Sequence, residues 1–145
     1  QEKNDNHDGM DMALCVIDKS SKILTFCGAK NSLVYIRDNE VYQIKGDRYS
    51  VGDPLEIGQK IFTNHVVSLE DNPMFYMFSD GYQDQFGGLE SKKFMISKLK
   101  NTLLRIHKKD MDVQKKFLDK TITHWMKDQD QIDDILVMGF HCLPT

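Results

Sequence analysis

The chain has 145 residues, of which 40% are hydrophobic and 28% are charged, and its formal net charge is −3. This composition predicts one folded domain and disfavours an intrinsically disordered chain. A mildly acidic chain gains little counterion-release energy from a phosphate backbone, so nucleic acid is not an expected partner. The longest apolar runs, Ala13–Ile17 and Ile135–Met138, are far shorter than the roughly 20 residues that span a bilayer. The sequence therefore predicts no transmembrane segment.

The first residues and the cysteines indicate whether the chain is part of a longer protein and in which compartment it lies. The chain begins with Gln1 and shows no signal-peptide pattern, so we expect a piece of a longer protein. Its three cysteines, Cys15, Cys27 and Cys142, form no C-x-x-C pair, and each lies in an apolar run, where cysteine behaves as a small hydrophobe. We expect a reducing, cytoplasmic location, either free or as the cytoplasmic part of a membrane-anchored sensor. A cysteine nucleophile stays an alternative, although no neighbouring residue in the sequence activates a thiol.

The first half of the chain has the alternation and composition of β-strands. The strands are expected at 10–18, 23–29, 32–37, 40–45, 61–69 and 73–79. Asp38-Asn39 between two β-rich runs predicts a tight hairpin, because both residues tolerate a positive φ. Gly46–Gly58 contains three glycines and Pro54, which indicates a loop. The run 73–79 is nearly continuous apolar sequence, as expected for a strand that is buried on both faces.

The second half changes to a helical period. Residues 91–107 and 110–127 are expected to form amphipathic helices, with Asp110 capping the second and Phe117 and Trp125 in the core. Residues 132–142 return to a strand pattern. Strands, two helices and a final strand predict an α+β fold in which helices pack on a mostly antiparallel sheet.

Two acidic segments stand next to apolar strands. Asp80 follows the strand 73–79 and precedes Gly81, and the pair Asp133-Asp134 interrupts the expected last strand. A carboxylate at a buried strand position costs several kcal/mol unless it is paired or metal-bound. Two such positions suggest a shared cation, and carboxylate ligands select a hard ion such as Mg²⁺ or Mn²⁺. The structural alternative is that Asp80 starts a turn and that Asp133 and Asp134 lie at a frayed strand end.

These segments resemble a known family. Phe78–Asp84 (Phe-Ser-Asp-Gly-Tyr-Gln-Asp), the Phe86-Gly87-Gly88 segment and Asp133–Met138 (Asp-Asp-Ile-Leu-Val-Met) are similar to the later motifs of the stage II sporulation protein E family. That family belongs to the metal-dependent, type 2C serine/threonine protein phosphatases. The segment Gly28–Val34 resembles the family's Ala-Gly-His-Asn-Pro segment, from which it departs at two positions. The order and spacing of the motifs carry the resemblance, which runs over most of the chain.

The resemblance implies an α-β-β-α sandwich of mostly antiparallel sheets with flanking helices and with two Mn²⁺ or Mg²⁺ ions at one edge. Two adjacent cations would activate a water that attacks a phosphoserine or phosphothreonine of a regulatory protein. Matched residue by residue, Asp80 and Asp133 would be metal ligands, and Gly81 and Asp134 would support them. The implied whole protein is a phosphatase in a bacterial signalling system.

One part of the family pattern is absent from the sequence. The family's first metal motif, an Asp followed closely by Gly-His-Gly, does not occur in the 145 residues, and neither do the two long helices that follow it. We therefore expect residues 1–145 to be a single phosphatase-like domain that is truncated at its N-terminus and inactive by itself. An uncovered sheet face would favour a homodimer. A non-catalytic phosphatase-like interaction module and an unrelated hydrolase or metal-binding domain are the alternatives.

Overall fold

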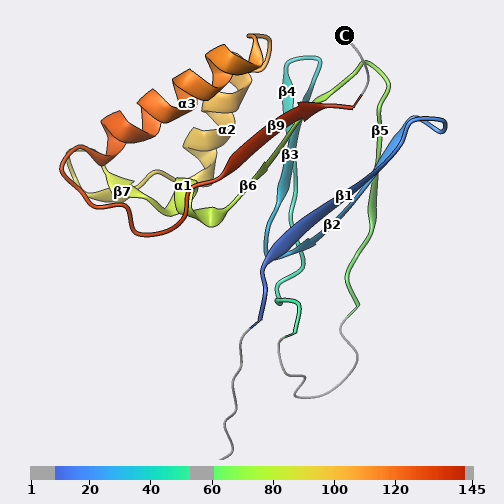
Figure 1. Ribbon diagram of the computed structural model, residues 1–145, viewed down its shortest axis with the longest axis horizontal. Helices are drawn as coiled ribbons and strands as arrows, with labels where there is room; N and C mark the ends of the chain where they lie inside the picture. Colours follow the sequence, from blue (N-terminus) through green and yellow to red (C-terminus); the bar gives the residue numbers. More distant parts are fainter. Residues whose placement is uncertain (1–8, 53–60, 143–145) are drawn as a thin grey trace, which may run out of the picture.

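The computed structural model describes residues 9–52 and 61–142, and Figure 1 shows them arranged in layers. One layer is a three-stranded sheet in the order β1-β2-β5, and the next is a four-stranded sheet in the order β4-β3-β6-β9. The helices α2 (Ile96–Ile106) and α3 (Met111–Met126) cover the four-stranded sheet on the side away from β1 and β2. None of the helices in these ranges is long and apolar enough to cross a membrane.

The three-stranded sheet is antiparallel throughout. It consists of β1 (Met12–Asp18), β2 (Ile23–Ala29) and β5 (His65–Ser68). In β2, Leu24 and Phe26 are fully buried, because they point toward the four-stranded sheet. Side chains alternate between the two faces along each strand. Leu14 and Val16 of β1 pair with the positions of β2 that alternate with Leu24 and Phe26, so they lie on the outer face of the sheet.

The four-stranded sheet is also antiparallel. It consists of β4 (Glu40–Ile44), β3 (Leu33–Arg37), β6 (Met74–Phe78) and β9 (Val137–His141). The hairpin between β3 and β4 turns at Asp38 and Asn39, whose φ angles of 51° and 63° confirm the predicted turn. β6 is buried on both faces along most of its length, as its continuous apolar sequence predicts.

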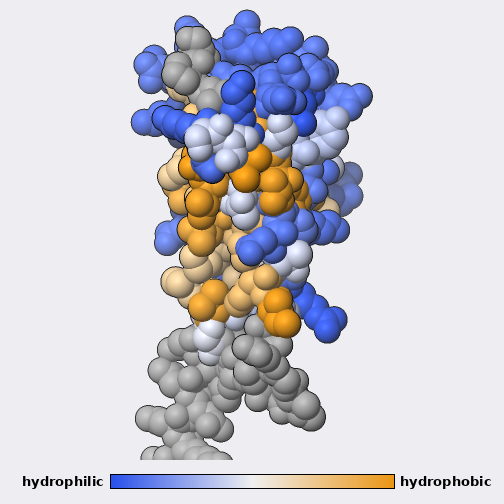
Figure 2. Space-filling view, turned by 90° about the vertical axis from the view of Figure 1, so that its right-hand side faces the viewer, coloured by the Kyte–Doolittle hydropathy of each residue, from blue (hydrophilic) through white to orange (hydrophobic). Residues whose placement is uncertain are grey.

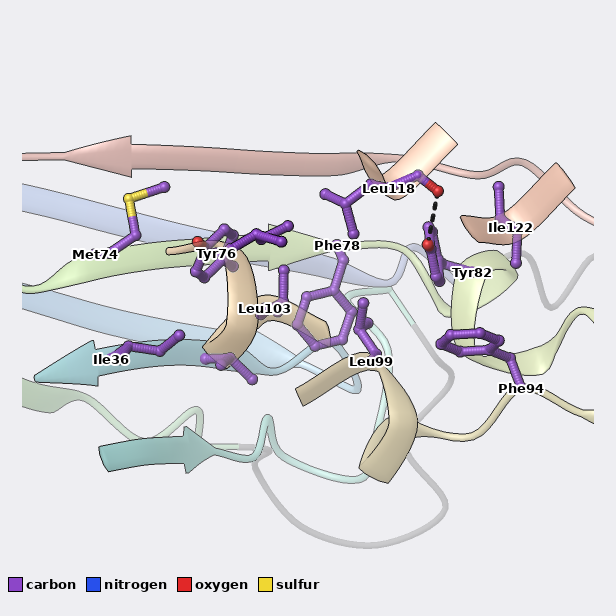
Figure 3. Close-up of a cluster of buried hydrophobic side chains, with 12 residues drawn as sticks. Ile36, Met74, Tyr76, Phe78, Tyr82, Phe94, Leu99, Leu103, Leu118 and Ile122 are labelled. Atoms are coloured by element: carbon purple, nitrogen blue, oxygen red, sulfur yellow. Dashed lines mark hydrogen bonds between the residues drawn. The ribbon is translucent and has the colours of Figure 1, made fainter. Parts of the chain in front are cut away.

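One hydrophobic core lies between the four-stranded sheet and the helices, and Figure 3 shows its side chains. Leu99 and Leu103 of α2 are fully buried in it, at the four-residue spacing that predicted an amphipathic helix. Tyr76 of β6 lies in the same core and donates a hydrogen bond to the Gln114 side chain of α3 at 2.7 Å. Because both polar groups are buried, this bond fixes the position of α3 on the sheet.

A second core lies between the two sheets, and the outer face of the three-stranded sheet is exposed. On that face Leu14, Val16 and Val66 are 49%, 59% and 65% exposed. Figure 2 shows hydrophobic side chains gathered on this side of the molecule. The described residues therefore form three layers, with helices on one side. The α+β class and the antiparallel sheets are confirmed. The described residues place helices on one side of the sheets, and the further pair of long helices that the resemblance implies is absent from the sequence.

Several sequence-based boundaries were wrong. The last strand begins at Val137 rather than at Ile132, so Asp133 and Asp134 precede β9 instead of interrupting it. The first long helix begins at Ile96, because a short hairpin of β7 (Phe86–Gly87) and β8 (Lys92–Lys93) occupies the preceding segment. The strand expected at 61–69 is limited to β5. Residues 53–60 of the predicted loop lie outside the described residues.

Two expectations for α3 also need correction. Phe117 is 36% exposed and Trp125 is only partly buried, because the apolar residues that face the sheet are Leu118 and Ile122. Asp110 stands at the N-cap position, as predicted, but its side chain makes no capping hydrogen bond. The apolar period located the helix, yet it did not show which side of the helix would meet the sheet.

Candidate functional site

The candidate site begins where β6 ends. Ser79 has extended backbone angles and leads into the short helix α1 (Asp80–Asp84). Asp80 is the first residue of this helix and is exposed, whereas Gly81 and Tyr82 are buried. Tyr82 donates a hydrogen bond to the backbone oxygen of Leu118 in α3 at 2.9 Å, as Figure 3 shows. The side chain of Tyr82 thereby anchors α1, while Asp80 faces solvent.

Ser79 joins this turn to the segment that carries the second acidic pair. Its hydroxyl donates to the backbone oxygen of Asp134 at 2.7 Å and accepts from the backbone N–H of Leu136 at 2.9 Å. The backbone N–H of Ser79 also donates to the oxygen of Leu136 at 3.1 Å. Since β6 and β9 are antiparallel neighbours, these bonds extend their pairing beyond the strands.

Gly81 permits the close approach of the two segments. A Cβ atom at this position would lie 2.9 Å from the carbonyl carbon of Asp134 and closer still to its oxygen. Only glycine fits without a backbone shift, which explains the Asp-Gly pair in physical terms. The backbone of Asp133 is also near, at 3.3 Å from the same Cβ position. The structure thus brings together the backbone segments of Asp80, Gly81, Asp133 and Asp134.

The expectation of buried carboxylates was wrong. Asp80, Asp133 and Asp134 are all exposed, because Asp80 follows the end of β6 and because Asp133 and Asp134 precede the start of β9. The cost of burying a charge therefore gives no argument for a cation here. The turn and strand-end alternative describes the backbone correctly, although the helical turn α1 was not expected. The observation that still favours a metal site is that two segments that carry carboxylates meet at one surface.

The donor chemistry at this surface fits a hard divalent ion. Carboxylate oxygens are the usual protein ligands of Mg²⁺ and Mn²⁺, which also retain several waters. One carboxylate oxygen of Asp133 accepts from the backbone N–H of Asp134 at 2.7 Å, which orients the side chain. Its second oxygen has no hydrogen-bond partner among residues 9–52 and 61–142. Within 9–52 and 61–142 there is no group of three or more His, Cys, Asp or Glu side chains that could hold a metal.

Sequence reasoning missed Gln85, which links both candidate segments. Its side chain is fully buried and donates to the backbone oxygen of Asp130 at 2.8 Å. It also accepts from the backbone N–H of Ile132 at 3.4 Å, while the backbone oxygen of Gln85 accepts from the indole N–H of Trp125 at 3.1 Å. Gln85 follows α1 directly and contacts the chain just before Asp133. A lone polar residue after an Asp-Gly turn gave no signal of this role.

The cysteine alternative receives no support from the thiols. All three cysteines are free, and partial burial raises the pKa of Cys15 from 9.0 to about 11. Burial likewise raises the pKa of Cys142. Since the thiolate is the reactive form, these two thiols are protonated and poorly nucleophilic near neutral pH.

Comparison with known proteins identifies the family of this sequence and solved structures with a similar fold. The sequence matches the family described as "Stage II sporulation protein E (SpoIIE)" over residues 1–142. Among solved structures, the SiaA-PP2C domain of Pseudomonas aeruginosa superposes with a TM-score of 0.84 at 29% identity over 92% of this chain. The phosphatase domain of SpoIIE from Bacillus subtilis superposes with a TM-score of 0.67 at 14% identity over 93% of this chain. No match was found among curated proteins.

The similarity covers only part of these relatives. The chain corresponds to 52% of the SiaA-PP2C chain and to 60% of the SpoIIE phosphatase chain. A bacterial serine phosphatase shows the same relation, with a TM-score of 0.63, 13% identity, 93% of this chain and 54% of its own. The chain therefore spans about half the length of the phosphatase domains that it resembles.

Proposed function

Because the chain belongs to the stage II sporulation protein E family, we propose that it is the C-terminal part of a metal-dependent protein serine/threonine phosphatase domain. The observation that carries the proposal is the junction at Ser79, which holds the Asp80 turn against the Asp133-Asp134 segment. The exposed carboxylates at this junction face solvent, where a phosphorylated side chain of another protein can reach them.

The proposed ions are Mn²⁺ or Mg²⁺, with Asp80 and Asp133 as ligands. When bound, such ions lower the pKa of a coordinated water and neutralise charge on the phosphoryl group. Gly81 contributes by letting the two backbone segments touch, and Asp134 contributes the N–H that orients the Asp133 carboxylate. A structure of the SpoIIE phosphatase domain with the words "Mn presoaked" in its description is among the similar structures and supports the choice of metal.

The substrate and setting belong to the same proposal. We expect the substrate to be a phosphoserine or phosphothreonine of a bacterial regulatory protein, and we expect the reaction to take place in the cytoplasm. A similar structure that is described as a bacterial serine phosphatase supports this class of substrate. The net charge of −3 continues to disfavour nucleic acid as a partner.

Phosphate release from a phosphoserine peptide with Mn²⁺ tests the function. The 145-residue chain is expected to release little phosphate, because the family's first metal motif, an Asp followed closely by Gly-His-Gly, is absent from its sequence. The natural protein that contains this chain is expected to be active. In that protein Asp80→Asn or Asp133→Asn should reduce the rate by orders of magnitude, whereas Asp119→Asn on the exposed surface of α3 should not. Equal rates for the three variants would contradict the assignment of Asp80 and Asp133.

A non-catalytic interaction module is the second candidate. The observation that favours it is the surface position of all three carboxylates, since exposed carboxylates need no cation. This candidate predicts that the natural protein is inactive with Mn²⁺ and that Asp80→Asn leaves partner binding unchanged.

Self-association through the three-stranded sheet is a separate proposal. β1 is the edge strand of that sheet, and the outer face beside it exposes Leu14 and Val16. Among the described residues, the other edge of β1 pairs with no strand. An apolar face beside such an edge can meet the same face of a second copy, because an isologous interface needs only one self-complementary patch.

A further inference from the structure

A groove lies between the β7–β8 hairpin, the start of α2 and the end of α3, outside the carboxylate site. Its volume is about 1090 Å³, and it is called the Trp125 groove below. Its apolar lining is formed by Phe86, Leu89, Met95 and Trp125. Its basic lining is formed by Lys92, Lys93, Lys98 and Lys127.

The apolar residues of the groove are exposed to an unusual degree. Leu89 is 94% exposed, Met95 is 53% exposed and Phe86 is 37% exposed. Trp125 is partly buried and meets Phe94 edge-on at 5.4 Å between ring centroids, so its position is fixed by the core. A rigid tryptophan with exposed apolar neighbours is typical of a protein-binding surface, where aromatic anchors contribute most of the affinity.

The charge around the groove has one dominant sign. Four lysines line it, against the single acid Glu90, although the whole chain carries a net charge of −3. Lys92 pairs with Glu90, and Lys93 pairs with Asp84 at 2.8 Å. Among the described residues, Lys98 and Lys127 form no ion pair, and the Lys98 Nζ lies 3.6 Å from the centre of the Trp125 ring. The rim therefore offers two cations for carboxylates of a partner.

The backbone holds the groove in a defined shape. Ser91, Met95 and Lys127 have φ angles of 48°, 76° and 50°, a region that residues other than glycine adopt at a cost. Backbone hydrogen bonds maintain this shape: Gly88 N–H to Trp125 O at 2.9 Å and Met95 N–H to Gln83 O at 2.7 Å. A surface that is already ordered loses less entropy on binding.

We propose that the Trp125 groove docks an acidic, amphipathic segment of a partner protein. An apolar side chain of the segment packs on Trp125 and Leu89, and its carboxylates meet Lys98 and Lys127. The hairpin of the groove follows α1 directly, so a docked partner lies beside the helix that carries Asp80. That the partner is the phosphorylated substrate rests on the proposed function, whereas the docking itself does not.

The fluorescence of Trp125, the single tryptophan of the chain, reports occupancy of the groove directly. The probe is a short peptide of Glu, Leu and Phe with an amphipathic pattern, and the matched control replaces each Glu with Lys. We expect a saturable fluorescence change with the acidic peptide that weakens as salt is added, and no change with the basic peptide. An acidic peptide that produces no change, or a basic peptide that binds equally well, would overturn the proposal.

Charge reversal locates the binding surface. Lys98→Glu combined with Lys127→Glu should weaken binding by at least about tenfold, because both substitutions replace attraction to the carboxylates of the peptide with repulsion. The matched control is Lys45→Glu combined with Lys116→Glu, which changes the net charge equally at exposed positions away from the groove. Equal effects of the two double variants would show general charge attraction and contradict the proposal.

A third variant tests the apolar part without risk to the fold. Leu89→Ser should weaken binding severalfold and should leave the fold intact, because the Leu89 side chain is exposed and lies outside the buried cores. Unchanged affinity would refute an apolar contact at Leu89. None of these measurements needs catalysis. If the peptide binds to a protein that has no phosphatase activity, the docking proposal stands and the phosphatase proposal fails. If the protein is active but does not bind the peptide, the docking proposal fails and the phosphatase proposal stands.

Discussion

Replacing Gln85 with leucine removes a buried amide and keeps nearly the same volume. The side chain is fully buried, and its amide donates to the backbone oxygens of Asp130 at 2.8 Å and Phe86 at 3.2 Å. The third bond, from the N–H of Ile132, is long at 3.4 Å. The backbone oxygen of Gln85 accepts hydrogen bonds from the Trp125 indole N–H and the Phe94 backbone N–H, and the substitution keeps this oxygen. Only the hydrogen bonds of the Gln85 side chain are therefore lost.

The expected loss of stability follows from these bonds. A net hydrogen bond contributes about 1 kcal/mol, and a partner left unsatisfied in a partly buried place adds to the cost. One strong and two weaker bonds predict a decrease of roughly 2 kcal/mol in the free energy of unfolding. Urea unfolding with linear extrapolation measures it, and the slope should stay constant.

Gln131→Leu is the matched control for this prediction. Gln131 is exposed and its side chain donates to the backbone oxygen of Asp133 at 2.8 Å, so the same chemical change occurs two residues from the same candidate ligand. Its effect should stay within about 0.5 kcal/mol. Equal losses for Gln85→Leu and Gln131→Leu would refute the view that Gln85 connects α1 to the acidic segment.

Three further outcomes are expected. Gly81→Ala should lower the free energy of unfolding by about 1–3 kcal/mol in urea, because its methyl group would meet the Asp134 carbonyl; a neutral effect would contradict the close approach. The free energy of unfolding should fall as pH rises from 9 to 11, because the Cys15 thiol loses its proton near pH 9 in the unfolded chain, whereas folding raises its pKa to about 11. Urea unfolding at several pH values should show a smaller decrease for Cys15→Ala than for the unchanged chain. Sedimentation should show self-association that Leu14→Glu with Val16→Glu abolishes, and a monomer at high concentration would exclude a dimer through this face.

Local sequence determined the elements whose cause is local. Asp38-Asn39 formed the predicted hairpin because both residues tolerate a positive φ, and the four-residue spacing of Leu99 and Leu103 located α2. The motif around Asp80 and Asp133 also identified the family that the comparison confirmed. These features depend on backbone preferences and on residue order, which can be read along the chain.

Tertiary structure alone decided how the candidate site is built. The sequence suggested that Asp80 and Asp133 lie at buried strand positions, yet both lie at the surface, in segments joined through Ser79. It also gave no signal of the role of Gln85 or of the partial exposure of Trp125. Apolar periodicity shows that one side of an element is buried, but not which element covers it. Burial and hydrogen-bond partners depend on contacts between residues far apart in the chain, and only the packed layers establish those contacts.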